Sequence, residues 1–579
     1  MKKIWFAIFL MLSHIVALGQ WNDNPAEAVL INTDGEYFFS YDLAMTPNGN
    51  TWLWLNAAGD AHKVQLYDTT GVAMLGDTLM LVSDYPDRLT GYVNQNLFVD
   101  RDGNAIVVVS DLRYTNGEGE LGTYTAYKIS QSGEMLWGDE GISLDNGNGT
   151  FINAMMGIVQ LSDGSYVFSW THCDMDEIFS VDLQRVSADG LLLWDAAVTR
   201  LTNPKGKESY FWPYIVDAGN SQCIVVFTRG SNLDLYARKL DFDGSPVWSE
   251  DTRIYRSGFP STPLWTFLDV EPSGDGGAIV TWYDDRFYTN TESIYMSYIK
   301  PNGELGFATG IDGQKLSYSG YRALSTDCMY DPATDSFIAL WRESSQGQGF
   351  YRVVAQRVSK EGELLWGEEG LEIEPYQEKD CADVRLCTAA DGQVAAFYMR
   401  RETLEYGDVD ICMQLIDTHT GTTKWESSKV ITDEVETTYK ADLHITECAP
   451  QNFWVYGWDD RGKTSNMDYK MLYINRVNSD GSVGNPADAA VAEIEAEGMS
   501  FAALSSVVDD EAMFAVDMPI PTQVALAIYN VNGDLIAIPF NGELSGRTYI
   551  EWKANVPSGV YFAVLSTAQD VRTIKLIIK

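Results

Sequence analysis

Short segments in which apolar and polar residues alternate recur along the chain, and most are followed by a turn that contains glycine. Examples are VDLQRVS (181–187), LYARKLD (235–241), IYMSYIK (294–300) and VVAQRVS (353–359). Alternation with β-branched and aromatic side chains is typical of half-buried β-strands. No long segment carries the period of a helix, so the pattern predicts an all-β protein.

The glycine turn belongs to a motif that recurs along the chain. In QSGEMLW, ADGLLLW, EGELLW and HTGTTKW a tryptophan follows the glycine by four positions, while weaker copies keep only the glycine. A nearly constant spacing of this kind indicates a repeat architecture. The motif occurs eight times, with glycines at Gly71, Gly133, Gly190, Gly244, Gly303, Gly362, Gly421 and Gly481.

A second turn lies upstream in each repeat, before a strand that ends in tryptophan. It is seen in SDGSYVFSW ending at Trp170, GDGGAIVTW at Trp282, TDSFIALW at Trp341 and QNFWVYGW at Trp458. Each unit then holds about four short strands, which is the content of one blade of a β-propeller. The repeats predict an eight-bladed β-propeller over residues 20–484.

The N-terminal segment supplies a part that the last repeat lacks. The separation of Trp21 from the next upstream-type turn, at Gly49, nearly equals that of Trp137 from Gly164. Trp21 therefore corresponds to the tryptophan strand that the copy at Gly481 has lost. We expect an N-terminal closing strand to pair beside residues 472–477 and to leave no open sheet edge between the termini.

Composition changes after the last repeat. Residues 485–497 form an Ala/Glu-rich linker, and residues 498–579 consist of alternating strands separated by turns such as Asn532-Gly533-Asp534. This pattern predicts a small C-terminal β-sandwich.

Residues 1–19 have the features of a secretory signal peptide. Lys2 and Lys3 precede an apolar run that ends in Ala17-Leu18-Gly19, a small-residue cleavage site. No cysteine follows that site and no other transmembrane candidate occurs, so a lipoprotein anchor and membrane insertion are not expected. The chain is predicted to be exported through the periplasm to the cell surface or the medium.

The net charge limits the class of ligand, and the cysteine content indicates the state of the thiols. The formal net charge is −42, which disfavours nucleic acid and anionic lipid as ligands. Seven cysteines are an odd number without a metal-type CxxC pair, and most lie in predicted strands. Buried free thiols are the favoured interpretation; Cys381 and Cys387 are close enough in sequence for a local disulfide bridge, which stays open.

Motifs that would identify a known catalytic chemistry are absent from the sequence. There is no HExxH, no GxSxG and no phosphate-binding glycine loop, and the four histidines after the signal peptide lie in different repeats. The acidic turns DRDG (100–103) and DFDG (241–244) are fragments of calcium loops without the full ligand pattern. The sequence predicts no cofactor, no metal ligand and no catalytic residue, with calcium left open.

A charged motif at the end of a strand supplies the candidate ligand-binding residues. WYDDR (282–286) recurs as WDDRG (458–462), and both place carboxylates beside an arginine. Such residues either bind a ligand at the rim of the ring or form an Asp–Arg pair that fixes a loop within a blade. Loops that depart from the repeat add further aromatic and arginine residues. The candidates are Arg113, Tyr114, Trp282, Asp284, Asp285, Arg286, Tyr288, Arg400, Asp459, Asp460 and Arg461.

These motifs resemble those of three known families. W-x-D-x-R, QRV and Gly-x-x-x-Trp strands together are similar to tandem repeats of secreted Bacteroidetes proteins, and DTHTGTTKW (417–425) resembles the tryptophan-docking motif of eight-bladed quinoprotein-type propellers. The latter resemblance implies that the indole packs between neighbouring blades.

The C-terminal domain resembles the sorting domain of type IX secretion. The motifs that carry this resemblance are YNVNGD (529–534), LSG (544–546) and PSGVYF (557–562). That resemblance implies contact with the type IX machinery.

Three functions fit a repeated scaffold without a catalytic motif. The favoured hypothesis is a non-enzymatic surface or secreted binding protein with an extracellular glycan or protein ligand. The alternative is a carbohydrate-active enzyme, a glycosidase or lyase, whose carboxylates are hidden among 82 acidic residues. A purely structural surface component is the third.

Overall fold

The structure is a computed structural model that forms two compact units, Met1–Asn485 and Pro486–Lys579. It describes residues 21–25, 28–31, 38–57, 61–76, 78–85, 96–113, 122–145, 154–173, 179–194, 199–201, 208–230, 233–256, 268–286, 291–345, 349–377, 380–389, 392–401, 409–432, 440–448, 453–460, 471–485, 500–503, 507–508, 511–531, 535–567 and 571–578. The predicted signal peptide lies outside these ranges, as does the predicted linker after its first residue, Asn485.

The predicted all-β class is confirmed. Within the described ranges the chain consists of strands, turns and one short 3-10 helix, η3 (Gly310–Asp312). No helix in that part of the chain is long and apolar enough to cross a membrane.

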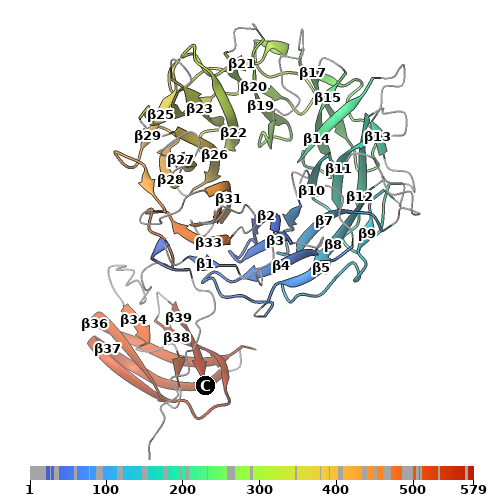
Figure 1. Ribbon diagram of the computed structural model, residues 1–579. Helices are drawn as coiled ribbons and strands as arrows, with labels where there is room; N and C mark the ends of the chain where they lie inside the picture. Colours follow the sequence, from blue (N-terminus) through green and yellow to red (C-terminus); the bar gives the residue numbers. More distant parts are fainter. Residues whose placement is uncertain are drawn as a thin grey trace, which may run out of the picture. The chain divides into compact units, whose positions relative to one another are not determined.

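The first unit contains eight antiparallel sheets among its described residues, which follow one another around a ring in Figure 1. Seven sheets use strands that are consecutive in the chain. In every sheet the strand called the inner strand here lies at the end that faces the middle of the ring. The inner strands are β2 (Phe38–Met45), β6 (Leu97–Val99), β10 (Ala154–Gln160), β14 (Tyr210–Asp217), β18 (Asp269–Pro272), β22 (Ala323–Asp331), β26 (Asp380–Thr388) and β31 (Lys440–Cys448).

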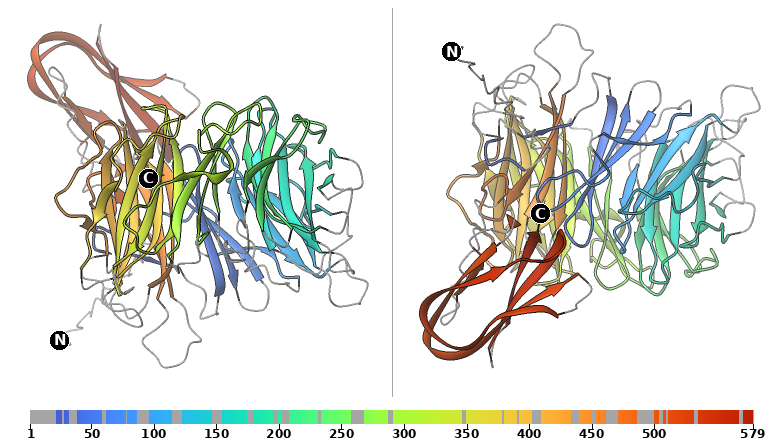
Figure 2. Two further views of the ribbon diagram at one scale, coloured as in Figure 1. Left: turned by 90° about the horizontal axis from the view of Figure 1, so that it is seen from above. Right: turned by 90° about the horizontal axis from the view of Figure 1, so that it is seen from below.

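The second and third strands of each sheet form its apolar centre, and all the sheets stand side by side around the ring in the views of Figure 2. The second strands are β3 (Thr51–Ala57), β7 (Ala105–Asp111), β11 (Tyr166–Cys173), β15 (Cys223–Arg229), β19 (Ala278–Asp284), β23 (Ser336–Ser344), β27 (Gln393–Arg401) and β32 (Phe453–Asp460). The third strands are β4 (Ala61–Tyr67), β8 (Thr123–Ile129), β12 (Phe179–Val186), β16 (Asp234–Leu240), β20 (Ser293–Ile299), β24 (Tyr351–Val358), β28 (Val409–Asp417) and β33 (Met471–Asn478).

The outer strands are short. They are β5 (Met80–Ser83), β9 (Ile142–Ser143), β13 (Thr199–Leu201), β17 (Thr252–Tyr255), β21 (Gln314–Lys315), β25 (Leu371–Glu374), β29 (Thr422–Thr423) with β30 (Lys429–Val430), and β1 (Val29–Leu30). Strand β1 pairs with β33, with Val29 opposite Ile474 and Leu30 opposite Tyr473. The N-terminal strand thus lies beside the region that the Trp21 spacing indicates.

The hydrophobic core lies between the faces of neighbouring sheets. Ile106 of β7, Ile158 of β10 and Phe168 of β11, for example, belong to one buried cluster. Six cysteines in the described ranges are buried, and Cys381 and Cys387 are among them. Burial of the two sheet faces leaves the inner edge of each sheet as the surface that borders the middle of the ring.

The glycine and the tryptophan of one motif turn out to contact different repeats. Gly190 has φ +85°, and a Cβ atom there would lie 2.8 Å from Cδ1 of Trp137, which belongs to the preceding copy of the motif. The Trp137 Nε1 donates a hydrogen bond of 3.0 Å to the carbonyl of Ala188 in the same turn. Gly71 meets Trp21 in the same way, with a Cβ position 2.7 Å from the indole Cδ2. The indole therefore joins neighbouring sheets.

We expect Gly190→Ala to destabilise the first unit more than Gly164→Ala. Both glycines have φ near +85°, but nothing lies within 4 Å of the Gly164 Cβ position, whereas that of Gly190 meets Trp137. Backbone strain alone costs about 1–2 kcal/mol, and overpacking adds about 1–3 kcal/mol. Equilibrium unfolding in urea measures both variants, and equal losses would show that the indole contact is not tight.

The second unit forms one six-stranded sheet in its described residues. Strands β36 and β37 pair along most of their length, with register shifts after Met518 and Leu526. One face buries Phe514, Leu526 and Trp552. The strands are β34 (Ser500–Ala503), β35 (Val507–Val508), β36 (Glu511–Asn530), β37 (Leu535–Lys553), β38 (Gly559–Ser566) and β39 (Val571–Ile578).

Candidate active site

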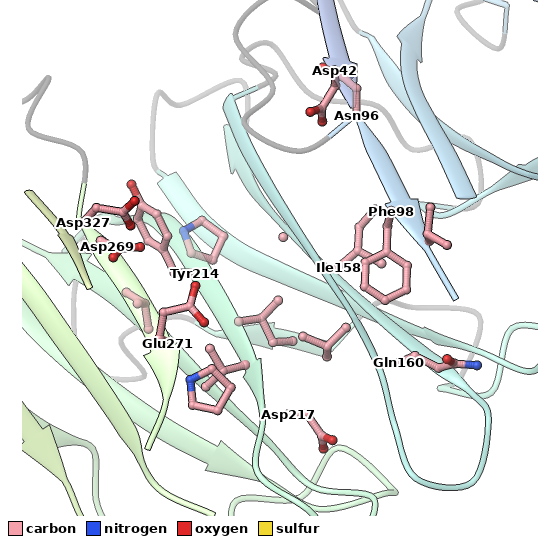
Figure 3. A pocket seen from close by; sticks show the side chains of 18 of the residues that line it. Asp42, Asn96, Phe98, Ile158, Gln160, Tyr214, Asp217, Asp269, Glu271 and Asp327 are labelled. Atoms are coloured by element: carbon pink, nitrogen blue, oxygen red, sulfur yellow. The ribbon is translucent and has the colours of Figure 1, made fainter. Parts of the chain in front are cut away.

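The inner strands surround a cavity of about 1000 Å³ in the first unit. Every one of the eight inner strands, or the turn beside it, contributes lining residues. We call this space the central cavity, and Figure 3 shows part of its wall. Ligand-binding pockets commonly have volumes of about 300–1000 Å³, so the central cavity is large enough to hold several sugar rings.

Irregular register in the inner strands directs side chains into the cavity. The pairing shifts between Phe211 and Tyr214 in β14 and between Leu324 and Thr326 in β22. Ser325, inside the second shift, has φ +51°. A bulge inserts an extra residue and re-aims the side chains that follow it. Tyr214 and Thr326 both line the cavity immediately after a shift.

Two aspartates from neighbouring inner strands form a carboxyl pair. Asp269 of β18 is hydrogen-bonded to Asp327 of β22, and both line the central cavity (Figure 3). Asp269 also accepts the backbone N–H of Cys328, and Asp327 accepts that of Leu386 at 2.7 Å. Each aspartate therefore also links its own inner strand to the next one.

Burial and neighbouring negative charge hold a proton on this pair. Burial is the main cause that raises the pKa of Asp269 well above its usual value, followed by the charges of Asp327 and Glu271 and the hydrogen bond to Asp327. Two carboxyl groups in hydrogen-bond contact cannot both ionise easily. Asp269 is accordingly a proton donor that persists to higher pH than an ordinary aspartate.

Glu271 supplies a second carboxylate on the same strand. It lies two positions after Asp269 in β18 and also lines the central cavity. Side chains two apart on a strand share a face, and their Cα atoms are about 6.5 Å apart. A protonated carboxyl and a separate carboxylate therefore face the same space, as acid–base chemistry on a glycosidic bond requires.

Another part of the wall carries an aromatic and imidazole group. His444 Nδ1 of β31 lies 3.5 Å from Asp42 Oδ1 of β2, and the rings of Tyr41 and His444 are 4.4 Å apart. In Figure 3 Asp42 lies beside Asn96, in a group apart from the one that contains Asp269, Asp327 and Glu271. Asn96 is held by its side-chain amide, which donates to the carbonyl of Val108 at 3.0 Å.

The two arginines of the lining are engaged by the protein itself. Arg101 donates to the carbonyl of Leu161 at 2.9 Å and lies 3.5 Å from Asp217. Arg385 donates to the carbonyl of Val384 at 2.8 Å. Five carboxyl groups line the same cavity, namely Asp42, Asp217, Asp269, Glu271 and Asp327. The lining is therefore acidic.

The residues chosen from the W-x-D-x-R motif form a clasp inside one sheet. Trp282 is buried and its Nε1 donates to Asp284 at 2.8 Å. Arg286 makes two hydrogen bonds to the Asp284 carboxylate, of 2.9 and 2.7 Å, and its guanidinium lies 3.4 Å from the centre of the Tyr295 ring. This arrangement is the Asp–Arg pair that fixes a loop, which was one of the two interpretations of the motif.

Arg113 and Arg400 are held in separate sheets. Arg113 lies over the Tyr85 ring at 3.8 Å and donates to the carbonyl of Glu140 at 2.7 Å. Arg400 pairs with Glu374 at 3.3 Å and with Asp410 at 3.2 Å.

The other candidates give less information. Asp285 is half-buried beside the clasp, and Asp459 and Asp460 pair with the backbone of β33. Tyr114, Tyr288 and Arg461 lie outside the described residues. The central cavity is lined by none of the sequence candidates among the described residues. That they bind a ligand stays a prediction.

Sequence reasoning missed the carboxyl pair, although a signal existed. Asp269 stands almost as far before Gly303 as Asp327 stands before Gly362, so the two aspartates occupy nearly equivalent places in successive repeats. Aligning the repeats on the glycine turn finds this pair. Register shifts in the inner strands interrupt the alternation that would mark which of their side chains face the cavity.

The acidic turns have a structural explanation. In DRDG, Asp100 accepts the backbone N–H of Asp102 at 3.0 Å and of Asn104 at 2.8 Å. In DFDG, Asp243 accepts the N–H of Ser245 at 2.9 Å. Across the described ranges, no group of three or more His, Cys, Asp and Glu side chains is placed to hold a metal ion.

No protein-family model and no curated protein matches the chain. Among solved structures it is similar to a polysaccharide lyase of a new family, an ulvan lyase bound to -[GlcA(1-4)Rha3S]-, with a TM-score of 0.39 and 8% identity over 81% of this chain and 96% of that one. A Penicillium chrysogenum α-L-arabinanase complexed with arabinobiose has a TM-score of 0.31 and 12% identity over 70% and 98% of the two chains. The endo-arabinase of Bacteroides thetaiotaomicron has a TM-score of 0.27 and 14% identity over 45% and 92%.

These comparisons correct the favoured functional hypothesis. The three structures named are a polysaccharide lyase, an arabinanase and an endo-arabinase, so the hypothesis of a non-enzymatic binding protein is not upheld. At these identities the likeness concerns the fold. The chemistry has to be argued from the central cavity itself.

Proposed function

We propose that the protein is a carbohydrate-active enzyme that hydrolyses glycosidic bonds in the central cavity. The observation that carries this proposal is the carboxyl pair, in which Asp269 keeps a proton beside Asp327 and faces the same space as Glu271. A general acid with a raised pKa and a nearby carboxylate are the two groups that glycoside hydrolysis uses.

Asp269 donates its proton to the glycosidic oxygen as the bond between that oxygen and the anomeric carbon breaks. Glu271 accepts a proton from the water molecule that attacks the anomeric carbon, so that one water is consumed for each bond cleaved. Asp327 holds the Asp269 carboxyl in place through their hydrogen bond. Acid and base thus come from one strand, and the orienting group comes from its neighbour.

Incubation of the purified chain with a panel of polysaccharides tests the proposal. We expect new reducing ends and shorter chains from at least one uncharged substrate, without unsaturated uronic ends. Unsaturated ends would indicate lyase chemistry instead. No turnover on any arabinan, xylan, galactan, glucan or mannan, under acidic and neutral conditions, would contradict the proposal.

For the fold we propose an eight-bladed β-propeller closed by the N-terminal strand, followed by a C-terminal β-sandwich. Support for the first comes from the eight sheets among the described residues, from the pairing of β1 with β33 and from the contact between Trp21 and Gly71. The length of β36 and β37 and their register shifts support a sheet that folds over on itself.

We also propose export by the type IX route, with residues 1–19 as signal peptide and residues 498–579 as sorting domain. The ordered motifs YNVNGD, LSG and PSGVYF support this assignment. The protein would then act at the cell surface or in the medium, where polysaccharide substrates are encountered.

Deletion of residues 498–579 is expected to trap the remaining chain in the periplasm, because the sorting signal is lost while the signal peptide stays. Fractionation of cells followed by immunoblotting measures this. Deletion of residues 1–19 should instead retain the chain in the cytoplasm. Unchanged secretion of the chain without its tail would contradict the assignment.

A further inference from the structure

We infer that the central cavity takes uncharged glycans and rejects glycans whose sugars carry carboxylate or sulfate groups. The inference rests on the proposed function and adds the substrate class. It follows from the charged groups that line the cavity and from the arginines at one edge of the surrounding sheets.

The cavity wall offers a glycan carboxylates and apolar groups. Carboxyl groups come from five positions, and two of them, Asp269 and Glu271, lie where the cleaved bond is proposed to sit. Phe98 and Val99, both half-buried, line the same space and present apolar surface on which the faces of sugar rings can pack. Carboxylates suit the hydroxyl groups of an uncharged sugar, because each oxygen accepts a hydrogen bond.

The wall contains two guanidinium groups, and both make hydrogen bonds to the protein's own backbone. Arg101 lies on backbone carbonyls and beside Asp217, and Arg385 donates to Val384 of its own strand. An anionic sugar is normally recognised by an arginine that can make two parallel hydrogen bonds to it. Arg101 is engaged by two carbonyls and a carboxylate, whereas Arg385 is exposed and gives one hydrogen bond to the backbone.

Several arginines at one edge of the sheets are also engaged by carboxylates. In an antiparallel sheet the start of the inner strand and the end of the second strand lie at one edge; in one sheet Asp269 pairs with Thr281 and the second strand ends at Asp284. Four arginines at this edge are paired with carboxylates: Arg286 with Asp284, Arg322 with Glu292, Arg352 with Glu343 and Arg400 with Glu374.

A sugar carboxylate or sulfate would therefore enter a space in which five carboxyl groups outnumber two arginines, one of which already contacts Asp217. Like charges at short range inside a partly enclosed cavity repel strongly, because solvent screens them poorly. We expect anionic glycans to bind roughly 10–100-fold more weakly than uncharged ones of similar length.

Affinity electrophoresis of the full chain tests this in gels that contain arabinan, xylan, galactan, glucan or mannan as uncharged polymers, and polygalacturonate, alginate or a sulfated galactan as anionic ones. The Asp269→Asn variant is used, so that binding is read without cleavage. Retardation by an uncharged polymer and none by the anionic ones is expected. Preferential retardation by an anionic polymer, or none by any uncharged one, overturns the inference.

Two charge variants separate the cavity from the general acidity of the protein. Adding Asp217→Asn and Glu271→Gln to the binding variant should raise the affinity for polygalacturonate about tenfold or more, since two carboxylates of the lining are removed. Adding Glu361→Gln and Glu363→Gln, which neutralise two exposed carboxylates in a repeat turn, should leave it unchanged. Equal effects would place the discrimination outside the cavity and overturn the inference.

The binding test of the inference and the cleavage test of the proposed function can fail independently. Release of reducing ends from polygalacturonate by the wild-type chain would overturn the inference and leave glycoside hydrolysis standing. Selective retention by uncharged polymers with no cleavage of any of them would do the reverse.

Discussion

Replacing Asp269 with asparagine is expected to lower kcat/KM on the cleaved glycan by about 10²–10⁴-fold, because the carboxyl that donates the proton is removed while its shape is kept. The rate of release of reducing ends measures the effect. Asp217→Asn, which changes a carboxylate of the same lining that contacts Arg101, is the matched control and should retain most of the activity.

The pH profile adds a second expectation for the same residue. The proposed chemistry needs the protonated form of Asp269, whose pKa is raised. Activity should therefore be lost as pH rises through that raised pKa. A rate that increases up to alkaline pH would show that Asp269 is not the acid.

The free energy of unfolding distinguishes a catalytic role of Asp269 from a structural one. Because its pKa is raised in the folded state, the folded chain binds the proton more tightly than the unfolded chain does. This contribution to stability is present at low pH and decreases as pH rises from about 4 toward the raised value. Asparagine removes that loss, so the variant should unfold at the same or a higher urea concentration at neutral pH. A strong destabilisation would show that the link to Cys328 dominates.

Arg286→Ala is expected to destabilise the first unit by about 3–5 kcal/mol, because it leaves the carboxylate of Asp284 buried without its cationic partner. The Asp284 side chain is 0% exposed and that of Arg286 is 14% exposed, and the two make bidentate hydrogen bonds. Equilibrium unfolding in urea gives the free energy.

A matched pair nearby provides the control. Arg253 lies 3.2 Å from Asp234, but its side chain is 40% exposed, so Arg253→Ala should cost less than about 1 kcal/mol. If Arg286→Ala leaves stability unchanged and instead abolishes glycan binding, the residues of the W-x-D-x-R motif are ligands, as the alternative interpretation of the sequence holds.

The sequence predicts the all-β class and the repeat because both depend on residues that recur with a regular spacing. The glycine turn needs a positive φ in every copy, so glycine is retained and is visible as a period. Regular spacing also identifies Asp284 and Arg286 as part of a recurrent motif. The geometry of the clasp indicates that the motif recurs because the Asp–Arg pair fixes a loop.

The cavity could not be predicted in this way. Its shape depends on bulges such as those before Tyr214 and Thr326, and a bulge changes which side chains face inward without leaving a regular pattern. The pKa of Asp269 depends on Asp327, which belongs to the next repeat along the chain. Residues that differ between repeats carry the chemistry, and a search for periodicity passes over them.

The offset contact between Gly190 and Trp137 has a consequence for how such a chain can evolve. In a single repeat, the glycine lacks the indole of the preceding repeat, and the indole lacks the glycine of the following repeat. Such a unit is therefore incomplete alone. A duplicated unit inserted in tandem supplies both groups at once and fits between any two neighbours. The number of modules can therefore change by gene duplication without redesign of the joint, while the inner strands remain free to diverge.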